Sequence, residues 1–148
     1  MVFFTAVVAA VLLLDQATKW LVVQKMPFEG SIPLIKNIFH LTYVENTGAA
    51  FGILPDQVAF FIGVSLVAIV LLVLYYRQTP KDDYWLKSAL CRIMGGAVGN
   101  LIDRVRLGVV IDFLDFRVWP VFNLADVAIS VGVSMLVFHL YFQDEKVN

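Results

Sequence analysis

Two short stretches of the sequence place carboxylates beside long apolar segments. The stretch "GVVIDFLDF" carries Asp112 and Asp115, and "FNLAD" carries Asp126 at the start of an apolar run. Two carboxylates held close together share a proton, so one can activate a water as a base while the other donates to a carbonyl oxygen. The pattern therefore predicts aspartic-protease chemistry at Asp126 and one of the first two aspartates, the other being an ordinary surface carboxylate.

Asp126 also has a structural interpretation. Asn123 suits the N-cap of a helix, and Asp126 would then be the third helical residue. A carboxylate there completes a capping box and meets the positive end of the helix dipole. Capping does not explain why Asp126 enters at the same membrane face as Asp112, so the residues alone leave both roles open.

The stretch "DQATK" puts a charged pair near the end of the first apolar segment. Asp15 and Lys19 are four residues apart, which makes them neighbours on a helix and able to form an ion pair. Such a pair either anchors the end of the helix or supports and positions the loop that follows.

The stretch "GGAVGNLIDRVRLG" combines glycines with polar residues. Gly95 and Gly99 form a small-xxx-small face, which lets helices approach closely. Asn100, Asp103 and Arg104 share one helix face. Either Asp103 and Arg104 pair with each other, or Asn100 and Arg104 orient groups across the helix bundle, as supporting residues of active sites do.

The sequence lacks the patterns of other hydrolases. It has no GxSxG motif, and its two Gly-x-Ser pieces lie inside apolar runs. His40 and His139 are far apart and no HExxH or CxxC spacing exists, so a zinc site is not expected. Cys91 is the single cysteine, which excludes an intramolecular disulfide.

The composition is that of an integral membrane protein. Of the 148 residues, 60% are hydrophobic and 16% charged, and the mean hydropathy is +0.82, whereas soluble domains are about half apolar and a quarter charged. We expect the first apolar stretch to be a retained span, because it lacks the Lys or Arg that opens a secretory signal. The net charge of −1 argues against nucleic-acid binding.

We predict an all-α membrane protein with one domain, 1–148, and four transmembrane helices. Each apolar segment is close to the roughly 20 residues that a helix needs to cross the hydrocarbon core. A small β-sheet at the membrane surface is expected between the first two helices, at 28–53, where short alternating runs lie between prolines. The four spans run roughly over 2–23, 58–76, 85–105 and 122–142.

This topology gathers the polar residues at one membrane face. Spans one and three run in the same direction, and span four starts where span three ends. Lys and Arg occur on both sides, so the positive-inside rule does not decide which face is cytoplasmic. The residues that meet there are Asp15, Lys19, Asn46, Asn100, Asp103, Arg104, Asn123 and Asp126.

A membrane transporter or proton relay is the alternative function, since it too uses intramembrane carboxylates. It requires polar groups along the interior of the bundle. Span two has only Ser65 in its middle, and span four has only Ser130 and Ser134. A scaffold with structural ion pairs would not explain the gathering of charges at one face.

Five blocks in order, "DQATK", "ENTGAAFG", "GGAVGNLIDR", "GVVIDFLDF" and "FNLADVAI", resemble those of the bacterial lipoprotein signal peptidases (signal peptidase II) over essentially the whole chain. The resemblance implies a four-helix membrane aspartyl protease that cuts prolipoproteins just before a diacylglyceryl-modified cysteine, with Asp112 and Asp126 as the dyad. Asp115 then has a supporting or surface role. The supporting residues it implies are Asp15, Lys19, Asn46, Gly48, Ala49, Asn100, Asp103, Arg104 and Asn123.

The same resemblance implies the surroundings of the protein. It would lie in the bacterial inner membrane with both ends cytoplasmic, and the dyad and the small extracytoplasmic sheet would lie near the outer leaflet. Its partners would be lipidated prolipoproteins and membrane lipids, and cyclic peptide inhibitors such as globomycin would bind at the dyad. No metal or organic cofactor is implied.

Overall fold

The computed structural model describes residues 2–48 and 55–144. A helix covers each of the four apolar segments: α1 (Val2–Lys25), α2 (Val58–Gln78), α3 (Tyr84–Leu107) and α4 (Leu124–Asp144). Among the described residues, α1, α2 and α4 are long and apolar enough to cross a membrane. α3 is as long as α1, but it does not join this group because charged residues interrupt it, especially near its end.

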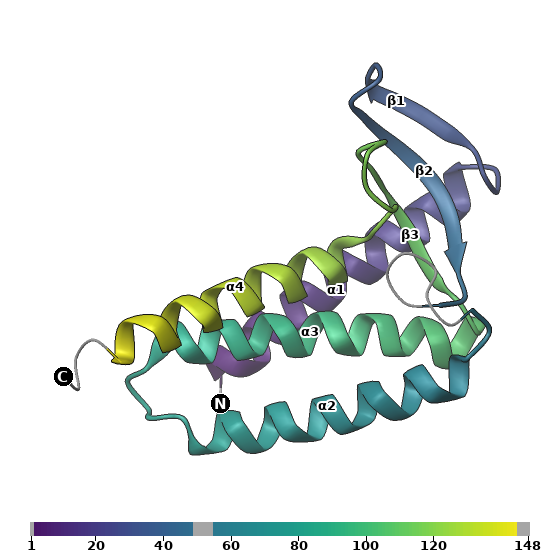
Figure 1. Ribbon diagram of the computed structural model, residues 1–148. Helices are drawn as coiled ribbons and strands as arrows, with labels where there is room; N and C mark the ends of the chain where they lie inside the picture. Colours follow the sequence, from purple (N-terminus) through teal and green to yellow (C-terminus); the bar gives the residue numbers. More distant parts are fainter. Residues whose placement is uncertain (1, 49–54, 145–148) are drawn as a thin grey trace.

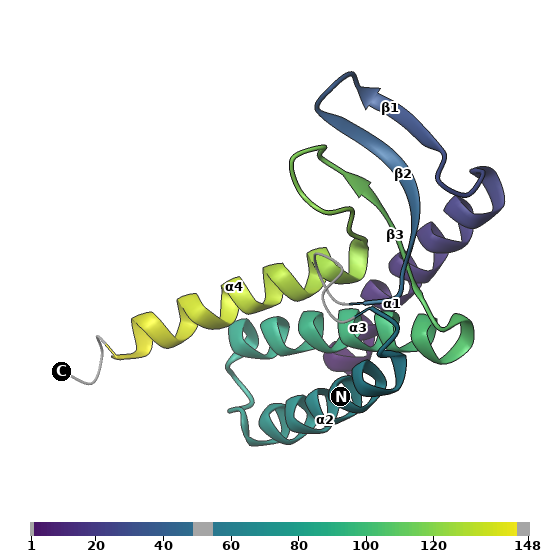
Figure 2. The ribbon, with the colours of Figure 1, turned by 45° about the vertical axis from the view of Figure 1, so that its right-hand side comes forward.

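α3 lies at the centre and packs against each of the other three helices (Figures 1 and 2). Glycines allow the close approach. A Cβ at Gly95 would lie 2.8 Å from the Cβ of Val11 on α1, and a Cβ at Gly99 would lie 2.5 Å from the carboxylate of Asp15. The predicted small-residue face of α3 is confirmed, and it receives the charged part of α1.

The sheet has three antiparallel strands in the order β1 (Ser31–Ile35), β2 (Phe39–Asn46) and β3 (Val110–Asp115). The prediction of a sheet within 28–53 was incomplete, because β3 comes from the connection between α3 and α4. Val44 pairs with Asp112, and His40 with Asp115. The strand nature of β3 was missed because five of its six residues are buried, so it lacks the alternation of a half-exposed strand.

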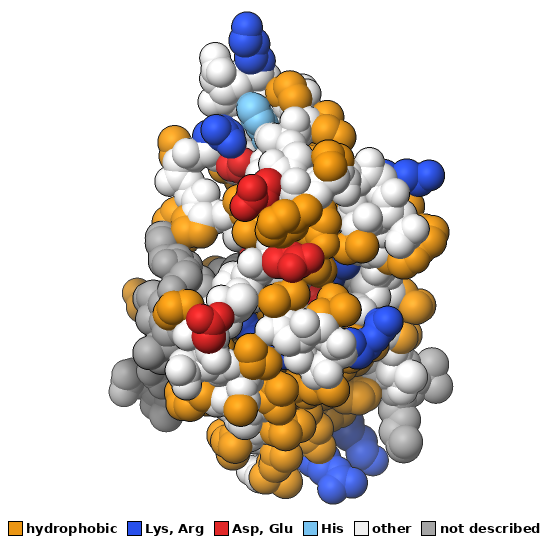
Figure 3. All heavy atoms as spheres, turned by 90° about the vertical axis from the view of Figure 1, so that its right-hand side faces the viewer, with side chains coloured by type: hydrophobic (Ala, Val, Ile, Leu, Met, Phe, Trp, Pro, Cys, Tyr) orange, Lys and Arg blue, Asp and Glu red, His pale blue; other side chains and the backbone are white. Residues whose placement is uncertain are grey.

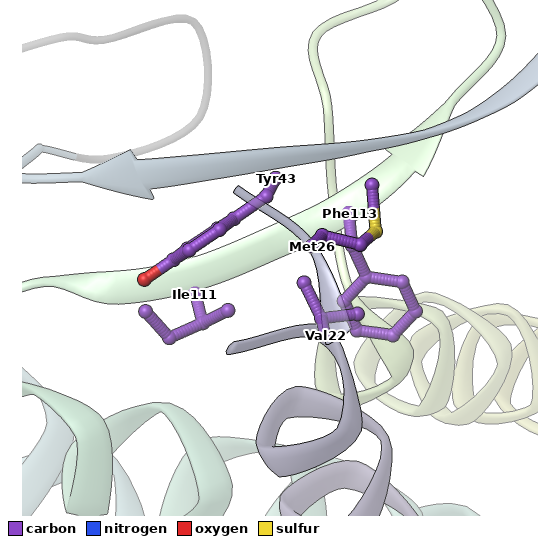
Figure 4. Close-up of a cluster of buried hydrophobic side chains, with 5 residues drawn as sticks. All are labelled: Val22, Met26, Tyr43, Ile111 and Phe113. Carbon is purple, nitrogen blue, oxygen red and sulfur yellow. The ribbon is translucent and has the colours of Figure 1, made fainter. Parts of the chain in front are cut away.

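A small hydrophobic cluster fixes the sheet to the end of α1 (Figure 4). It joins Val22 and Met26 of α1 to Tyr43 of β2 and to Ile111 and Phe113 of β3. Successive side chains of a strand point to opposite faces. Packing Ile111 and Phe113 against α1 therefore turns the residue between them, Asp112, to the other face of the sheet.

On the end of the molecule that carries the sheet, hydrophobic and charged side chains lie interspersed (Figure 3). Exposed hydrophobic residues there include Phe28, Ile32, Ile38 and Val118. Such a mixed surface suits the boundary between membrane and water.

Candidate active site

Asp126 forms the predicted capping box at the start of α4. The backbone N–H of Asp126 donates to Oδ1 of Asn123 at 3.0 Å, and the backbone N–H of Asn123 donates to Oδ2 of Asp126 at 3.2 Å. The structural interpretation of Asp126 is thus confirmed. Capping does not account for the other carboxylate oxygen of Asp126, Oδ1, which accepts a hydrogen bond of 2.8 Å from Nδ2 of Asn100 on α3.

Asn123 connects the cap to the other carboxylate. The side-chain oxygen of Asn123 accepts from the backbone N–H of Asp126, which can only donate. The other end of the amide is therefore the nitrogen, Nδ2, which donates. Nδ2 donates to Oδ1 of Asp112 at 2.7 Å and to Oδ1 of Asn100 at 3.1 Å. Asn123 therefore contacts both Asp112 and Asp126, although the two arrive on different elements.

Lys19 fixes the orientation of the side-chain amide of Asn100. Its Nζ lies 2.9 Å from Oδ1 of Asn100, 2.9 Å from Asp15 and 2.7 Å from Asp103, and all four side chains are buried. An ammonium can only donate. The oxygen of Asn100 is therefore held toward Lys19 and Asn123, and its nitrogen toward the Asp126 carboxylate.

The predicted Asp15–Lys19 pair is confirmed, but Asp103 and Arg104 do not pair with each other. Asp103 binds Lys19 and also accepts from Gln16, at 2.9 Å. Sequence reasoning missed Gln16 as a partner, although it lies within the "DQATK" block beside Asp15. Asp15 itself accepts from the backbone N–H of Ala125, at 3.0 Å, which ties α1 to the first turn of α4.

Asn46 and Arg104 complete the polar surroundings. Nδ2 of Asn46 donates to Oδ2 of Asp112 at 3.0 Å, and its Oδ1 accepts from the backbone N–H of Gly48 at 2.9 Å. Arg104 donates to the carbonyl of Gly48 at 3.2 Å and lies 5.1 Å from the centre of the Phe61 ring. Ala49, also expected at the site, lies outside the described residues.

Asp112 and Asp126 line one cavity of about 650 Å³. Polar groups of Asn46, Asn100 and Arg104 surround the two carboxylates, and the remaining lining is almost entirely apolar. The wall therefore suits a substrate with one polar and one hydrocarbon part. The other residues that line the cavity are Val110, Phe116, Trp119, Pro120, Val121, Phe122, Val127, Ile129, Ser130 and Val131.

The environment of Asp112 favours its neutral form. Burial is the largest cause, and the nearby Asp126 carboxylate adds to it, so that the pKa of Asp112 is raised to about 7 despite hydrogen bonds from Asn46 and Asn123. A carboxyl group that is neutral near pH 7 can donate a proton to a reacting oxygen.

Asp115 differs from Asp112 in its partners. It accepts from Oγ1 of Thr42 at 2.7 Å and forms an ion pair of 2.9 Å with Arg117. Burial alone would raise the pKa of Asp115, but these hydrogen bonds and the Arg117 charge lower the pKa below its ordinary value. Asp115 is buried, unlike a surface carboxylate, and among the described residues it does not line the cavity.

Comparisons with known proteins identify the family of the chain. A family model described as signal peptidase (SPase) II matches residues 7–142. The lipoprotein signal peptidase of Halothermothrix orenii is 52% identical over 142 residues, covering 96% of this chain and 97% of that protein. That of Moorella thermoacetica is 45% identical, covering 93% of this chain and 91% of that protein.

The fold is also similar to a solved structure, described as a bacterial membrane enzyme determined by the in meso method at 2.3 Å resolution. The two superpose with a TM-score of 0.91 at 29% sequence identity, covering 98% of this chain and 91% of the other.

Within the described residues, no group of three His, Cys, Asp or Glu side chains is arranged to hold a metal ion.

Proposed function

Since the chain belongs to the signal peptidase II family, it is a protease that removes signal peptides from prolipoproteins, and we propose that Asp112 and Asp126 are its catalytic dyad. The observation that carries the proposal is that both carboxylates line one cavity and are bridged by Asn123. Asp115 and Asp103 are each bound by a cation instead.

The two carboxylates have different roles in this mechanism. Asp126 is the base, because the first turn of α4 and the capping contacts favour a negative charge there. Asp112 is the acid, because burial without a helix dipole favours its neutral form. This assignment follows a general rule: of two neighbouring carboxyl groups in different environments, one serves as the acid and the other as the base.

The reaction proceeds through one activated water. Asp126 takes a proton from the water, whose oxygen attacks the scissile carbonyl, while Asp112 gives its proton to the carbonyl oxygen. The tetrahedral intermediate collapses as the C–N bond breaks, and the proton on Asp126 passes to the leaving amine. Asp112 then takes back a proton from a hydroxyl group on the former carbonyl carbon, which restores the starting state of the dyad.

The substrate residue after the cut is a diacylglyceryl-modified cysteine in this proposal. The apolar wall formed by Trp119, Pro120 and the first turns of α4 would receive its hydrocarbon part. Arg104 and Asn46 face the peptide backbone near the carboxylates. Cyclic peptide inhibitors such as globomycin would occupy the same cavity.

All four helices cross the bacterial inner membrane as one domain in this proposal, with both ends cytoplasmic and the sheet against the outer leaflet. α3 can cross despite its charges, because Asn100 and Asp103 are buried among partners from α1 and α4. The exposed hydrophobic residues of the sheet support its contact with the membrane surface. A polar path along the bundle, which a transporter requires, has no support in the middle of α2 or α4.

Incubation of the purified protein with a lipidated prolipoprotein peptide tests the function. We expect cleavage before the diacylated cysteine, and the same peptide with an unmodified cysteine should be cut far more slowly. Equal cleavage of the two peptides would contradict the proposed recognition of the lipid.

A further inference from the structure

One face of α4 leads from the dyad cavity toward the opposite end of the helix bundle. Val127, Ser130 and Val131 line the cavity, and Ser134 and Phe138 continue the same face at helical spacing. All five are exposed along a span that otherwise suits contact with lipid. We call these five residues the α4 stripe.

The side chains in the middle of the α4 stripe are more polar and smaller than a lipid-facing helix surface requires. Ser130 and Ser134 form a small-xxx-small pair, and the Ser134 hydroxyl donates to the carbonyl of Ser130 at 2.8 Å, so it adds little bulk. Small residues, serine included, mark places where transmembrane helices approach one another closely. α4 packs mainly against α3 and less against α1. Of the five stripe residues, Phe138 contacts the Trp85 ring of α3, with 5.9 Å between the ring centroids, and all five remain exposed.

A second cavity, of about 480 Å³, lies at the far end of the α4 stripe. Phe138 lines it together with Asp82 and Asp83, so acidic groups meet the stripe there. Asp83 accepts from the Leu86 N–H, which caps α3, and its other oxygen lies 3.2 Å from Nε2 of His139. Asp82 is exposed. The lining also includes Pro80, Trp85, His139 and Phe142.

The length of the α4 stripe fits a signal peptide. From Asp126 to Phe138 a helix rises about 18 Å, and the apolar part of a signal peptide, with roughly 7–15 residues, rises about 10–22 Å as a helix. The segment before this apolar part is positively charged. An occupant held at the dyad would thus bring its basic start to Asp82 and Asp83.

We propose that the signal-peptide helix of the substrate lies along the α4 stripe, with its lipidated end at the dyad cavity and its basic start at the Asp82–Asp83 cavity. The inference rests on the proposed function, because it presupposes a prolipoprotein at the dyad. The rival surface is the groove on α2 formed around Gly63, Val64 and Val67. None of the described residues that line the dyad cavity belongs to α2.

Photo-crosslinking distinguishes the two surfaces. A benzoylphenylalanine replaces Ser134, Phe142 or, as the matched control on α2, Val67. The probe is a lipidated prolipoprotein peptide whose scissile amide is N-methylated. We expect position 134 to capture the apolar part of the peptide and position 142 its basic start, with no capture at position 67. Capture at 67, reversed order, or no capture at 134 and 142 would overturn the assignment.

Steady-state kinetics provide the second measurement. Ser134→Trp should raise KM at least about tenfold with kcat little changed, because it removes binding that is the same in ground and transition states. Val67→Trp should leave both unchanged. An unaltered KM for Ser134→Trp would overturn the docking face. Failure of the unaltered protein to cut the lipidated peptide would instead reject the proposed function, so the two failures are distinguishable.

Discussion

Asn123 donates a hydrogen bond of 2.7 Å to Asp112 with its side-chain nitrogen, while its side-chain oxygen caps α4. A single side chain thus links the start of a helix to a carboxylate on a strand. The same oxygen that holds the cap fixes the direction of the amide, so the nitrogen cannot turn away from Asp112. Helix capping and the geometry of the site are therefore coupled.

The first prediction separates these two roles. Serine caps helices about as well as asparagine but is too short to reach Asp112. Asn123→Ser should keep α4 intact and lower kcat by about 10²-fold, because the dyad loses a positioning contact. Asn123→Ala should lower activity similarly and lose about 1 kcal/mol more of the unfolding free energy. Thermal melts and cleavage rates check both, and full activity of Asn123→Ser would show that the contact is dispensable.

The second prediction concerns the buried cation at the base of the site. Lys19→Met leaves Asp15 and Asp103 buried without their ammonium partner, which typically costs roughly 3–5 kcal/mol. Adding Asp103→Asn to Lys19→Met should recover part of this loss, because one uncompensated charge disappears. Thermal unfolding in detergent measures both variants. A loss within experimental error for the single variant would contradict the ion-pair network.

Much of this arrangement could be predicted from residue spacing, and the missing part is long-range. Pairs three or four residues apart on a helix, such as Asp15 with Lys19 and Asn123 with Asp126, follow from local geometry alone. The partner of Asp103 does not, because Lys19 is far from it in sequence. β3 was missed for a similar reason, since its strand character depends on pairing with β2 and on burial that no local pattern signals.

The choice between Asp112 and Asp115 illustrates the same limit. Both lie on β3 three residues apart, and their alternation places them on opposite faces. Which face meets the cavity depends on how Ile111 and Phe113 pack against α1. The residues alone left the two aspartates equivalent, and the family resemblance favoured Asp112. Among the described residues, Asp112 lines the cavity and Asp115 does not, while the catalytic role of Asp112 stays a prediction.

The third prediction is the topology. Cysteines replace Lys81 and Arg117 one at a time in a chain with Cys91→Ala, and intact cells are treated with a membrane-impermeant thiol reagent. We expect labelling at position 117, in the connection after β3, and none at position 81 until the cells are opened. Labelling of position 81 but not 117 in intact cells would invert the proposed orientation.

The fourth prediction is a pH dependence that follows from Asp112. Its pKa is about 7 in the folded protein against an ordinary 3.8, so the folded state holds this proton between roughly pH 4 and pH 7 while the unfolded state does not. The contribution of Asp112 to stability is thus full below that window and is lost as the pH rises through it. Activity should likewise fall above about pH 7, because the acid has lost its proton.

Asp112→Asn provides the control for the stability part. An amide does not titrate, so the decline in melting temperature between about pH 4 and pH 7 should be smaller in this variant than in the unaltered protein. The neighbouring charged groups, Asp126, Arg104 and Lys19, remain in both proteins. Identical pH profiles of stability would show that Asp112 is ionised throughout.

The last prediction returns to Asp126. If it acted only as a cap, Asp126→Asn would cost at most roughly 1 kcal/mol and leave cleavage intact. As a member of the dyad it cannot be replaced by an amide, which neither accepts a proton as a base nor supplies one, and acid–base catalysis alone is worth about 10²–10⁴-fold. We expect Asp112→Asn and Asp126→Asn each to abolish cleavage while the protein still binds its lipidated substrate.

The double variant Asp112→Asn/Asp126→Asn should be little worse than either single one, because residues that act as a unit are not additive. Asp115→Asn is the matched control on the same strand. It should retain most activity, since Thr42 and Arg117 hold Asp115 apart from the cavity. Cleavage and binding of the lipidated peptide are measured for all four variants. Substantial turnover by Asp126→Asn, in a preparation free of the unaltered enzyme, would leave this residue with its capping role alone.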